Sequence, residues 1–358
     1  STTELFGFVR YIIQGSDASN KDIKRGDMFT AVNGTPLTTA NYQSLLFGSN
    51  ENYVLNMADF NGTTVVSNGK TISLTKTTLT ENPILVKKVI SVGTKKIGYL
   101  MYNGFYADFD SQLNTVFGEF KSQGITDLVL DLRYNSGGSV RTATYLASMI
   151  TGQFTGKIFA KQQWNPKIND YFEKNDPDGL SNFFTDKIGS TPINSVNMTK
   201  VYILTTKSSA SASELVINGL KPHINVVQIG DATTGKNVGS VTLYDSPDFT
   251  EKNKNPKHKY AMQPIVLKIV NSAGFGDYFN GLAPTHELKE TISTFGILGN
   301  ENEPLLKLAI AKITGTGKLT PQSSGKEFEF FKDSKSSNPF GNQMYLDKAP
   351  RGLQKALD

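Results

Sequence analysis

The chain has 358 residues, 38% of them hydrophobic, and its 37 basic and 32 acidic side chains leave a formal net charge of +5. This length is more than one compact domain usually needs, so we expect two domains and a tail. The basic residues are scattered, which argues against a nucleic-acid-binding surface. The absence of cysteine excludes disulfides, thiolate metal sites and a cysteine nucleophile.

No stretch of the sequence approaches the roughly 20 consecutive apolar residues that a membrane-spanning helix needs. The sequence opens directly on a strand-like segment and shows no signal peptide, as expected of a mature or trimmed protein.

The first eighty residues are typical of a separate β-rich module. β-Branched and aromatic residues predict strands over 5–12, 54–57 and 71–74, and a short helix is predicted over 39–47. The dipeptide Asn33-Gly34 predicts a tight turn.

Strands and helices alternate after a linker around Asn82-Pro83, which is typical of an α/β core. A strand beginning at Lys96 is followed by a helix over 108–124, whose apolar residues recur at helical spacing. A strand over 126–133 and a helix over 139–151 come next.

Two later regions differ from this pattern. Residues 155–198 hold the only tryptophan and several other aromatic residues among polar ones, and form a long connection. Such a connection is usually functional or has its own structure, so it is either a lid over a cleft or a satellite cluster on the surface. Residues 316–358 form a tail that ends in a short predicted helix, with an aromatic patch at Phe328, Phe330 and Phe331.

The serine cluster Ser209-Ala210-Ser211-Ala212-Ser213-Glu214 lies between an apolar strand at 201–204 and a helical stretch at 214–220. A hydroxyl at such a junction is presented at the end of a strand, and the positive end of the following helix stabilises a developing oxyanion. This is a favourable place for a hydrolase nucleophile.

Lys236 closes a glycine-bounded turn, Gly230-Asp231-Ala232-Thr233-Thr234-Gly235-Lys236, that follows a second apolar strand. A lysine can act as the base for a serine only when burial lowers its pKa, because the charged form cannot accept a proton. The order strand, serine, helix, strand, lysine is that of a Ser–Lys dyad.

With these motifs the chain resembles the C-terminal processing, or tail-specific, serine peptidases, over about residues 5–310. The family's spacing between serine and lysine selects Ser211 as nucleophile and Lys236 as general base. The segment Asp131-Leu132-Arg133-Tyr134-Asn135-Ser136-Gly137-Gly138 is similar to the family's D-L-R-x-N-x-G-G motif. The resemblance implies that Gly137 or Gly138, together with Ala212, supplies the oxyanion hole.

The N-terminal module resembles a PDZ domain, whose I-x-x-G-D-x-[IF]-x-x-V-N-G pattern is matched at 23–34. The carboxylate-binding loop of such domains corresponds to Leu5-Phe6-Gly7-Phe8, in which the first glycine is replaced. By this resemblance, Phe6, Gly7 and Phe8 would bind the end of an extended peptide through backbone amides. A module that only packs against the protease core, or gates it, is the alternative.

Three positions depart from the family pattern. Pro222 stands where several members have an aspartate, and Thr285 replaces an acidic residue near the end of the core. Ser240 stands where several members have a glutamine that orients the lysine, so Ser240 is a possible lysine orienter.

Other sites are weaker candidates. His223, His258 and His286 are scattered without the spacing of a metal site or a partner for a Ser–His–Asp triad, so neither a metal nor a cofactor is expected. The basic cluster at 252–259 is interpreted as the tip of a solvated hairpin rather than an anion site.

The sequence therefore predicts an α+β protein: a PDZ-like β-rich domain (1–80), a crotonase-like α/β (ββα-spiral) protease core (81–315, with 155–198 a possible lid insertion) and a C-terminal tail (316–358). The expected function is a serine endopeptidase that cuts extended or unfolded polypeptides near their C-termini. The alternative is an inactive peptide-binding scaffold of the same fold. Family membership implies a bacterial cell envelope, on the periplasmic side.

Overall fold

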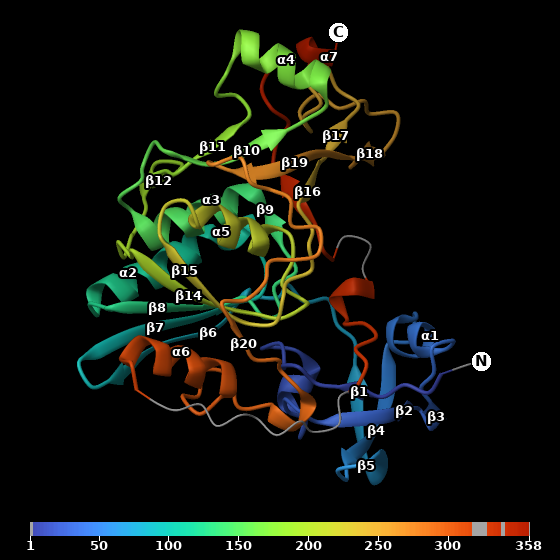
Figure 1. The fold of residues 1–358 in the computed structure, drawn as a ribbon. Helices are drawn as coiled ribbons and strands as arrows, with labels where there is room; N and C mark the ends of the chain where they lie inside the picture. Colours follow the sequence, from blue (N-terminus) through green and yellow to red (C-terminus); the bar gives the residue numbers. More distant parts are fainter. Residues whose placement is uncertain (1–2, 317–327, 338–340, 358) are drawn as a thin grey trace. The chain divides into compact units, whose positions relative to one another are not determined.

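The computed structural model describes residues 3–316, 328–337 and 341–357. The chain divides into two compact units, traced in Figure 1. The N-terminal unit comprises residues 1–82, 291–304 and 318–333, and the larger unit comprises 83–290, 305–317 and 334–358. The domain ranges expected from the sequence stay predictions. The structure shows in addition that two later segments, within 291–304 and 318–333, belong to the same compact unit as the N-terminal residues.

The N-terminal unit contains one antiparallel sheet of order β1-β2-β4-β5, with β3 paired to β2. Its elements are β1 (Gly7–Phe8), η1 (Asp17–Asn20), β2 (Met28–Val32), β3 (Thr35–Pro36), α1 (Tyr42–Phe47), β4 (Asn52–Phe60), β5 (Val65–Thr75) and, from the later segments, η3 (Ile292–Thr294). The core side chains of β4 and β5 alternate along each strand, as expected for a sheet with one buried face: Leu55, Met57, Ile72 and Leu74. Ile23, Val32 and Leu37 complete this core.

The predicted strand over 5–12 is much shorter in the structure. Only Gly7 and Phe8 pair with β2. The residues before β2 form a turn, in which Asp27 N–H donates to Lys24 O at 3.1 Å. Strand β2 would have to extend before Met28 to pair with residues 10–12, and this turn stands in its place. Residues 10–12 therefore have no neighbouring strand with which to form hydrogen bonds.

The first sheet of the larger unit has the order β20-β15-β14-β8-β7-β6. Its strands are β6 (Ile84–Val92), β7 (Lys95–Tyr102), β8 (Asp127–Asp131), β14 (Lys200–Thr205), β15 (Asn225–Gly230) and β20 (His286–Glu287). All neighbours are parallel except β6, which pairs antiparallel with β7. The carboxyl ends of β8, β14 and β15 therefore meet at one edge, where the loops that follow them carry the glycine pair, the serine cluster and the lysine turn.

The second sheet of the larger unit has the order β11-β10-β19-β16-β21-β9. Its strands are β9 (Gly138–Ser139), β10 (Ile158–Gln163), β11 (Ser181–Phe183), β16 (Val238–Val241), β19 (Ile265–Asn271) and β21 (Met344–Leu346). Strand β21, from the C-terminal region, pairs in parallel with both β16 and β9. It joins the strand after the lysine turn to the strand that contains Gly138.

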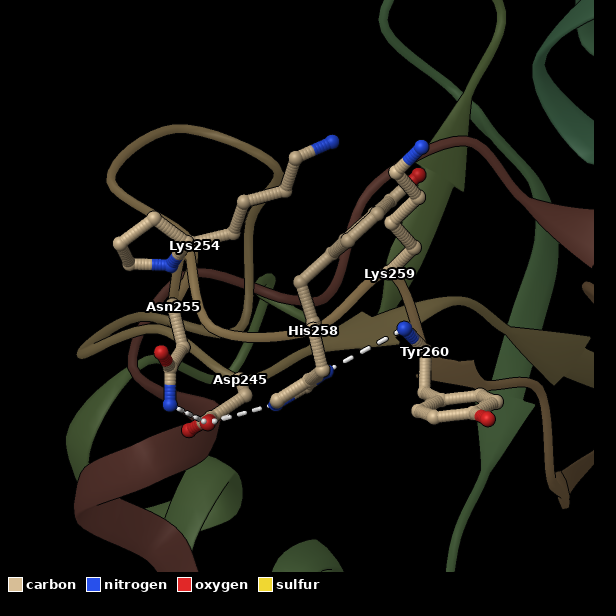
Figure 2. A pocket seen from close by; sticks show the side chains of 8 residues that line it. Asp245, Lys254, Asn255, His258, Lys259 and Tyr260 are labelled. Atoms are coloured by element: carbon tan, nitrogen blue, oxygen red, sulfur yellow. Dashed lines mark hydrogen bonds and ion pairs between the residues drawn. The ribbon is translucent and has the colours of Figure 1, made fainter.

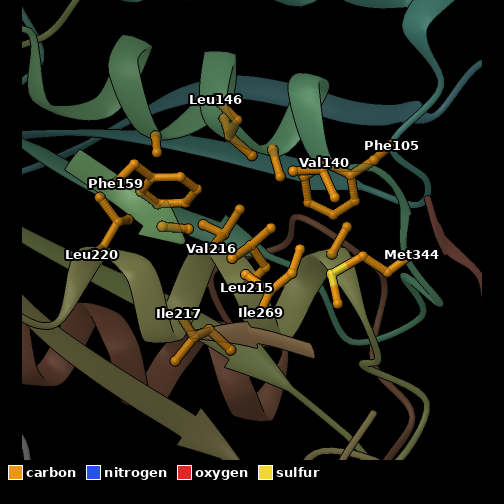
Figure 3. Packing of buried hydrophobic residues seen from close by; sticks show 14 of the residues in the cluster. Phe105, Val140, Leu146, Phe159, Leu215, Val216, Ile217, Leu220, Ile269 and Met344 are labelled. Carbon is orange, nitrogen blue, oxygen red and sulfur yellow. The ribbon is translucent and has the colours of Figure 1, made fainter. Parts of the chain in front are cut away.

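Helices pack between and around these sheets: α2 (Asp110–Ser122), α3 (Val140–Thr151), α4 (Pro166–Asn175), α5 (Ala212–Leu220), α6 (Pro304–Thr314) and α7 (Leu353–Leu357), with η2 (Ala107–Phe109) and η4 (Lys335–Ser337). Figure 3 shows Leu215 and Val216 of α5 packed with Leu146 of α3 and with Phe159 of β10. The predicted helices at 108–124 and 139–151 are confirmed as α2 and α3. Two short hairpins, β12 (Lys187–Ile188) with β13 (Thr191–Pro192) and β17 (Leu243–Tyr244) with β18 (Ala261–Met262), complete the unit.

The long connection over 155–198 forms β10, α4, β11 and the β12–β13 hairpin. Strand β10 lies between β11 and β19, inside the second sheet. Trp164, Ile168 and Phe172 belong to the main hydrophobic cluster of the larger unit. The segment is therefore part of that core and not a satellite cluster, and these contacts give a lid function no support.

The predicted tail is divided between the two units. Residues 328–333 group with the N-terminal unit, whereas β21 and α7 belong to the larger unit. The short helix predicted at the end is confirmed as α7. Residues 317–327 and 338–340 lie outside the described residues. Within the described ranges, no helix has both the length and the apolar character needed to cross a bilayer.

Candidate active site

Ser211 lies at a sharp junction between β14 and α5. Strand β14 ends at Thr205, and α5 begins at Ala212, directly after the serine. The backbone of Ser211 has φ 65° and ψ −114°, a conformation that costs a residue with a side chain roughly 1–3 kcal/mol. Such strain persists only where the surrounding contacts impose it, and it is common at functional sites.

The three serine hydroxyls of the cluster have different environments, although all three side chains are fully buried. Ser209 Oγ donates to Leu132 O at 2.8 Å, and Ser213 Oγ donates to Asn135 O at 2.9 Å. Among the described residues, Ser211 Oγ has no hydrogen-bond partner. A buried hydroxyl without a partner is costly, so Ser211 is the serine whose hydroxyl is held ready for another group.

Lys236 follows β15 and precedes β16. Its Nζ donates to Asn342 O at 2.5 Å. Burial lowers the pKa of Lys236, and the nearby Glu214 carboxylate raises it in part. A lysine with a lowered pKa has a larger neutral fraction, as a general base requires.

Glu214 joins the serine junction to the lysine turn. Its Oε2 accepts the N–H of Ser211 at 2.7 Å and the N–H of Lys236 at 2.8 Å, while Oε1 accepts the N–H of Gly235 and the hydroxyl of Thr233, both at 2.6 Å. The side chain is fully buried. Burial raises the pKa of Glu214, and the four donors oppose that shift. This carboxylate positions the two segments relative to each other.

The glycine pair lies against the serine. A Cβ added to Gly137 would come within 2.6 Å of Ser211 Cβ and 2.9 Å of Ser211 Oγ, and φ of Gly137 is 117°. The N–H of Gly137 donates to Asn135 Oδ1 at 2.9 Å. Gly138 pairs with Met344 of β21. Only a glycine fits this approach of the chain to Ser211.

Ser240, the possible lysine orienter, bonds elsewhere in this structure. Its Oγ donates to Met344 O at 3.3 Å and lies 3.3 Å from Gln263 Nε2, which donates to it. The carbonyl of Asn342 accepts from Lys236 Nζ instead. The acceptor for Lys236 in this structure is therefore a backbone carbonyl just before β21 and not the hydroxyl of Ser240.

The predicted peptide-binding residues belong to the N-terminal unit. Gly7 and Phe8 form β1, and a Cβ on Gly7 would lie 2.1 Å from the ring of Phe29, which explains the glycine. The ring of Phe6 contacts that of Phe328, with centroids 4.8 Å apart, and the ring of Phe8 contacts that of Phe295, with centroids 5.4 Å apart. The rings of Phe6 and Phe8 are thus in contact with later parts of this chain.

His223 is partly buried in the larger unit. His223 Nε2 lies 3.1 Å from Ile158 O, and its ring packs between Phe154 and Phe184. Burial lowers the pKa of His223. Within the part of the chain that the structure describes, no group of three or more His, Cys, Asp or Glu side chains could hold a metal ion.

The basic hairpin between β17 and β18 encloses a cavity of about 360 Å³, seen in Figure 2. A carboxylate already lies there: Asp245 Oδ2 accepts from Asn255 Nδ2 at 2.8 Å and lies 3.1 Å from His258 Nε2. These contacts lower the pKa of Asp245. Asp245 thus already takes the hydrogen-bond donors of Asn255 and His258 in this cavity.

Sequence reasoning missed two contributors to the site, Glu214 and Asn342. The position of Glu214 at the end of the serine cluster was the only signal for it, because an acidic residue three positions after a helix start is common. The contact of Asn342 with Lys236 joins residues more than a hundred positions apart, and no local pattern indicates such a pairing.

The chain resembles known proteins. Residues 96–250 match the family model described as Peptidase family S41. The chloroplastic C-terminal processing peptidase of Tetradesmus obliquus is 25% identical over 235 residues, which cover 62% of this chain and 46% of that protein. The chloroplastic carboxyl-terminal-processing peptidase 1 of Arabidopsis thaliana is 23% identical over 297 residues, which cover 80% of this chain and 54% of that protein.

The chain thus spans about half the length of these curated relatives. A solved structure also matches: a Bacteroides fragilis protein named after the S41 protease family is 27% identical, with a TM-score of 0.70. The match covers 88% of this chain and 81% of that one.

Proposed function

Because residues 96–250 place this chain in peptidase family S41, we propose that it is a serine endopeptidase with a Ser211–Lys236 dyad. One observation carries the proposal: Ser211 has a strained backbone and a buried hydroxyl without a partner among the described residues, and its backbone N–H donates to the same Glu214 oxygen as the backbone N–H of Lys236. Burial lowers the pKa of that lysine.

The dyad divides the reaction into two steps. Neutral Lys236 Nζ takes the proton of Ser211 Oγ as Oγ bonds to the scissile carbonyl carbon. The C–N bond then breaks, and Lys236 gives the proton to the leaving amine. In the second step a water molecule loses a proton to Lys236 as its oxygen bonds to the acyl carbon. The bond between that carbon and Ser211 Oγ then breaks, Lys236 returns the proton to Oγ, and the product leaves with a new C-terminal carboxylate.

The oxyanion of each tetrahedral intermediate needs backbone donors. We assign one to Ala212, because the first amides of a helix have no partner within it. The second donor that we assign comes from the glycine pair, Gly137 or Gly138, because the chain at Gly137 approaches Ser211 Oγ.

The substrates that we propose are extended or unfolded polypeptides, cut near their C-termini. Phe6, Gly7 and Phe8 of the N-terminal unit are proposed to contribute to peptide binding, by analogy with PDZ domains. The bacterial cell envelope, on its periplasmic side, is the proposed location. No cofactor takes part in this mechanism.

Active-site labelling and cleavage test the proposal together. A fluorophosphonate probe should label the native chain and not Ser211→Ala, and mass spectrometry should detect cleavage of an unfolded casein by the native chain only. If the native chain shows neither labelling nor cleavage between pH 7 and 10, it is the peptide-binding scaffold and not an enzyme.

A further inference from the structure

A hexapeptide near the C-terminus, residues 328–333 (Phe-Glu-Phe-Phe-Lys-Asp), lies against the side chains of the N-terminal unit. The ring of Phe328 contacts Phe6 with centroids 4.8 Å apart and Phe60 with centroids 5.2 Å apart. The interplanar angles of 76° and 77° are those of edge-to-face pairs, the favourable arrangement of aromatic rings.

The second half of the hexapeptide makes contacts of the same kind. Phe331 packs edge-to-face on Tyr42 of α1, with centroids 5.3 Å apart. The guanidinium of Arg10 lies 5.0 Å from the centre of the Phe330 ring, within the range of a cation–π contact.

A carboxylate completes the set. Asp333 Oδ2 accepts from Arg10 Nη1 at 2.9 Å, and both side chains are largely buried, with exposed fractions of 19% for Arg10 and 16% for Asp333. A charge-assisted bond in such a place is stronger than one on an open surface. The hexapeptide thus offers aromatic rings followed by a carboxylate to four side chains of the N-terminal unit, which we call the aromatic surface: Phe6, Arg10, Tyr42 and Phe60.

The core of the N-terminal unit is complete without the hexapeptide. The seven buried residues of that core, and the partly buried side chains packed on them, come from residues 5–74. Phe330 and Phe331 stay 47% and 46% exposed, although they contact the unit. A segment that the core does not need, bound through side chains at its surface, has the character of a bound peptide rather than of a structural element.

We propose that residues 328–333 are a built-in ligand of the aromatic surface, and that an external peptide with phenylalanine-like side chains and a carboxylate competes with them for it. Arg10 binds the carboxylate of either peptide. The proposal is independent of the peptidase activity, because it concerns binding alone.

Competition has a measurable consequence. An external peptide binds only the fraction of molecules whose surface is vacant, so its apparent Kd equals the intrinsic Kd divided by that fraction. A built-in ligand that fills the surface in nine molecules of ten raises the apparent Kd about tenfold.

The experiment measures fluorescence anisotropy of a labelled peptide Phe-Glu-Phe-Phe-Lys-Asp on the full chain, in a Ser211→Ala background that prevents cleavage. Phe328→Ala with Phe331→Ala should vacate the surface and tighten binding at least tenfold. Adding Arg10→Met to that variant should weaken binding at least tenfold. A peptide that ends in an amidated asparagine, and so lacks both terminal carboxylates, should lose the same factor.

Phe279→Ala is the matched control, because it removes a ring that is 64% exposed in the larger unit, and it should leave the affinity unchanged. Equal affinity of the peptide for the native and vacated chains, or no binding to either, overturns the proposal. The double variant is informative only if it unfolds cooperatively, as a folded protein does. If it does not, Asp333→Asn takes its place, because this substitution removes only the carboxylate that pairs with Arg10. It should still tighten binding of the external peptide.

Discussion

Ser211 and Lys236 donate their backbone N–H groups to the same atom, Oε2 of Glu214, at 2.7 and 2.8 Å. The proposed nucleophile and the proposed base come from two loops of the sheet edge, and this one oxygen joins them. The geometry of the dyad therefore depends on a residue that takes no part in the chemistry.

Replacing Glu214 should show this dependence. In Glu214→Gln an amide NH₂ replaces one carboxylate oxygen, and either position brings it against a donor: the N–H groups of Ser211 and Lys236, or the N–H of Gly235 with the Thr233 hydroxyl. We expect a loss of about 2–4 kcal/mol in the free energy of unfolding and a fall in kcat of at least tenfold. Urea denaturation and steady-state kinetics measure the two effects.

Thr233→Val is the control for that variant, since it removes one of the four donors to Glu214, together with the acceptor of the Leu282 N–H, and leaves the carboxylate in place. Its losses should be clearly smaller in both measurements. A Gln variant with native kcat would show that Glu214 does not position the dyad.

The three serines should differ sharply. Ser211→Ala should lower the cleavage rate of an unfolded polypeptide by at least a thousandfold. Ser209→Ala and Ser213→Ala should keep most of the activity and lose about 0.5–1.5 kcal/mol of stability, because each removes one of the two hydrogen bonds that a buried carbonyl accepts. Near-native turnover by Ser211→Ala would refute the assignment.

The pH dependence of kcat/KM should follow the ionisation of Lys236. Burial lowers its pKa from the ordinary value of ~10.4, and only the neutral amine accepts a proton. We therefore expect kcat/KM to rise with pH through one ionisation below ~10.4 and then to level off. Lys236→Arg should be as inactive as Lys236→Ala, since a guanidinium stays protonated; an active arginine variant would contradict the mechanism.

Gly137→Ala should abolish activity by direct crowding. The added Cβ would lie 2.6 Å from Ser211 Cβ, so the serine or the glycine loop must move. We expect a fall of at least a hundredfold in kcat/KM. Gly124→Ala is the matched control: its φ of 64° is also positive, but no atom lies within 4 Å of the added Cβ. Equal kinetics of the two variants would show that the contact with Ser211 is unimportant.

Asp110 should destabilise the fold at neutral pH. Burial raises its pKa to about 6, although the Thr142 hydroxyl donates to it. The folded state then holds this proton more tightly than the unfolded state, whose pKa is ~3.9, so the contribution to stability improves as pH falls from about 7 to about 4. Asp110→Asn should be more stable than the native chain at pH 7 by about 1–2 kcal/mol, after allowance for solvent screening.

Urea denaturation at pH 7 and at pH 4.5 checks this, and the difference between the two proteins should shrink at the lower pH. A constant difference would mean that Asp110 has an ordinary pKa in the folded state.

The helices at 110–122 and 140–151 could be predicted from sequence because apolar spacing and helix boundaries are local. The strand expected over 5–12 could not, because its length depends on a partner strand that a distant turn ends. The same distinction holds at the site. The residue types and spacing of Ser211 and Lys236 singled them out in the sequence, whereas the acceptor of the lysine came from Asn342 and not from Ser240.

The sequence by itself determined which chemical groups this protein has: a serine after a strand, a lysine after a glycine turn and a glycine pair, each recognisable because its function needs a local backbone geometry. Only the tertiary structure decided which of three serine hydroxyls is unpartnered, which carboxylate joins the loops and which surface binds residues 328–333. These properties depend on contacts between residues far apart in the chain, and such contacts follow from the packing of the whole fold rather than from any local pattern.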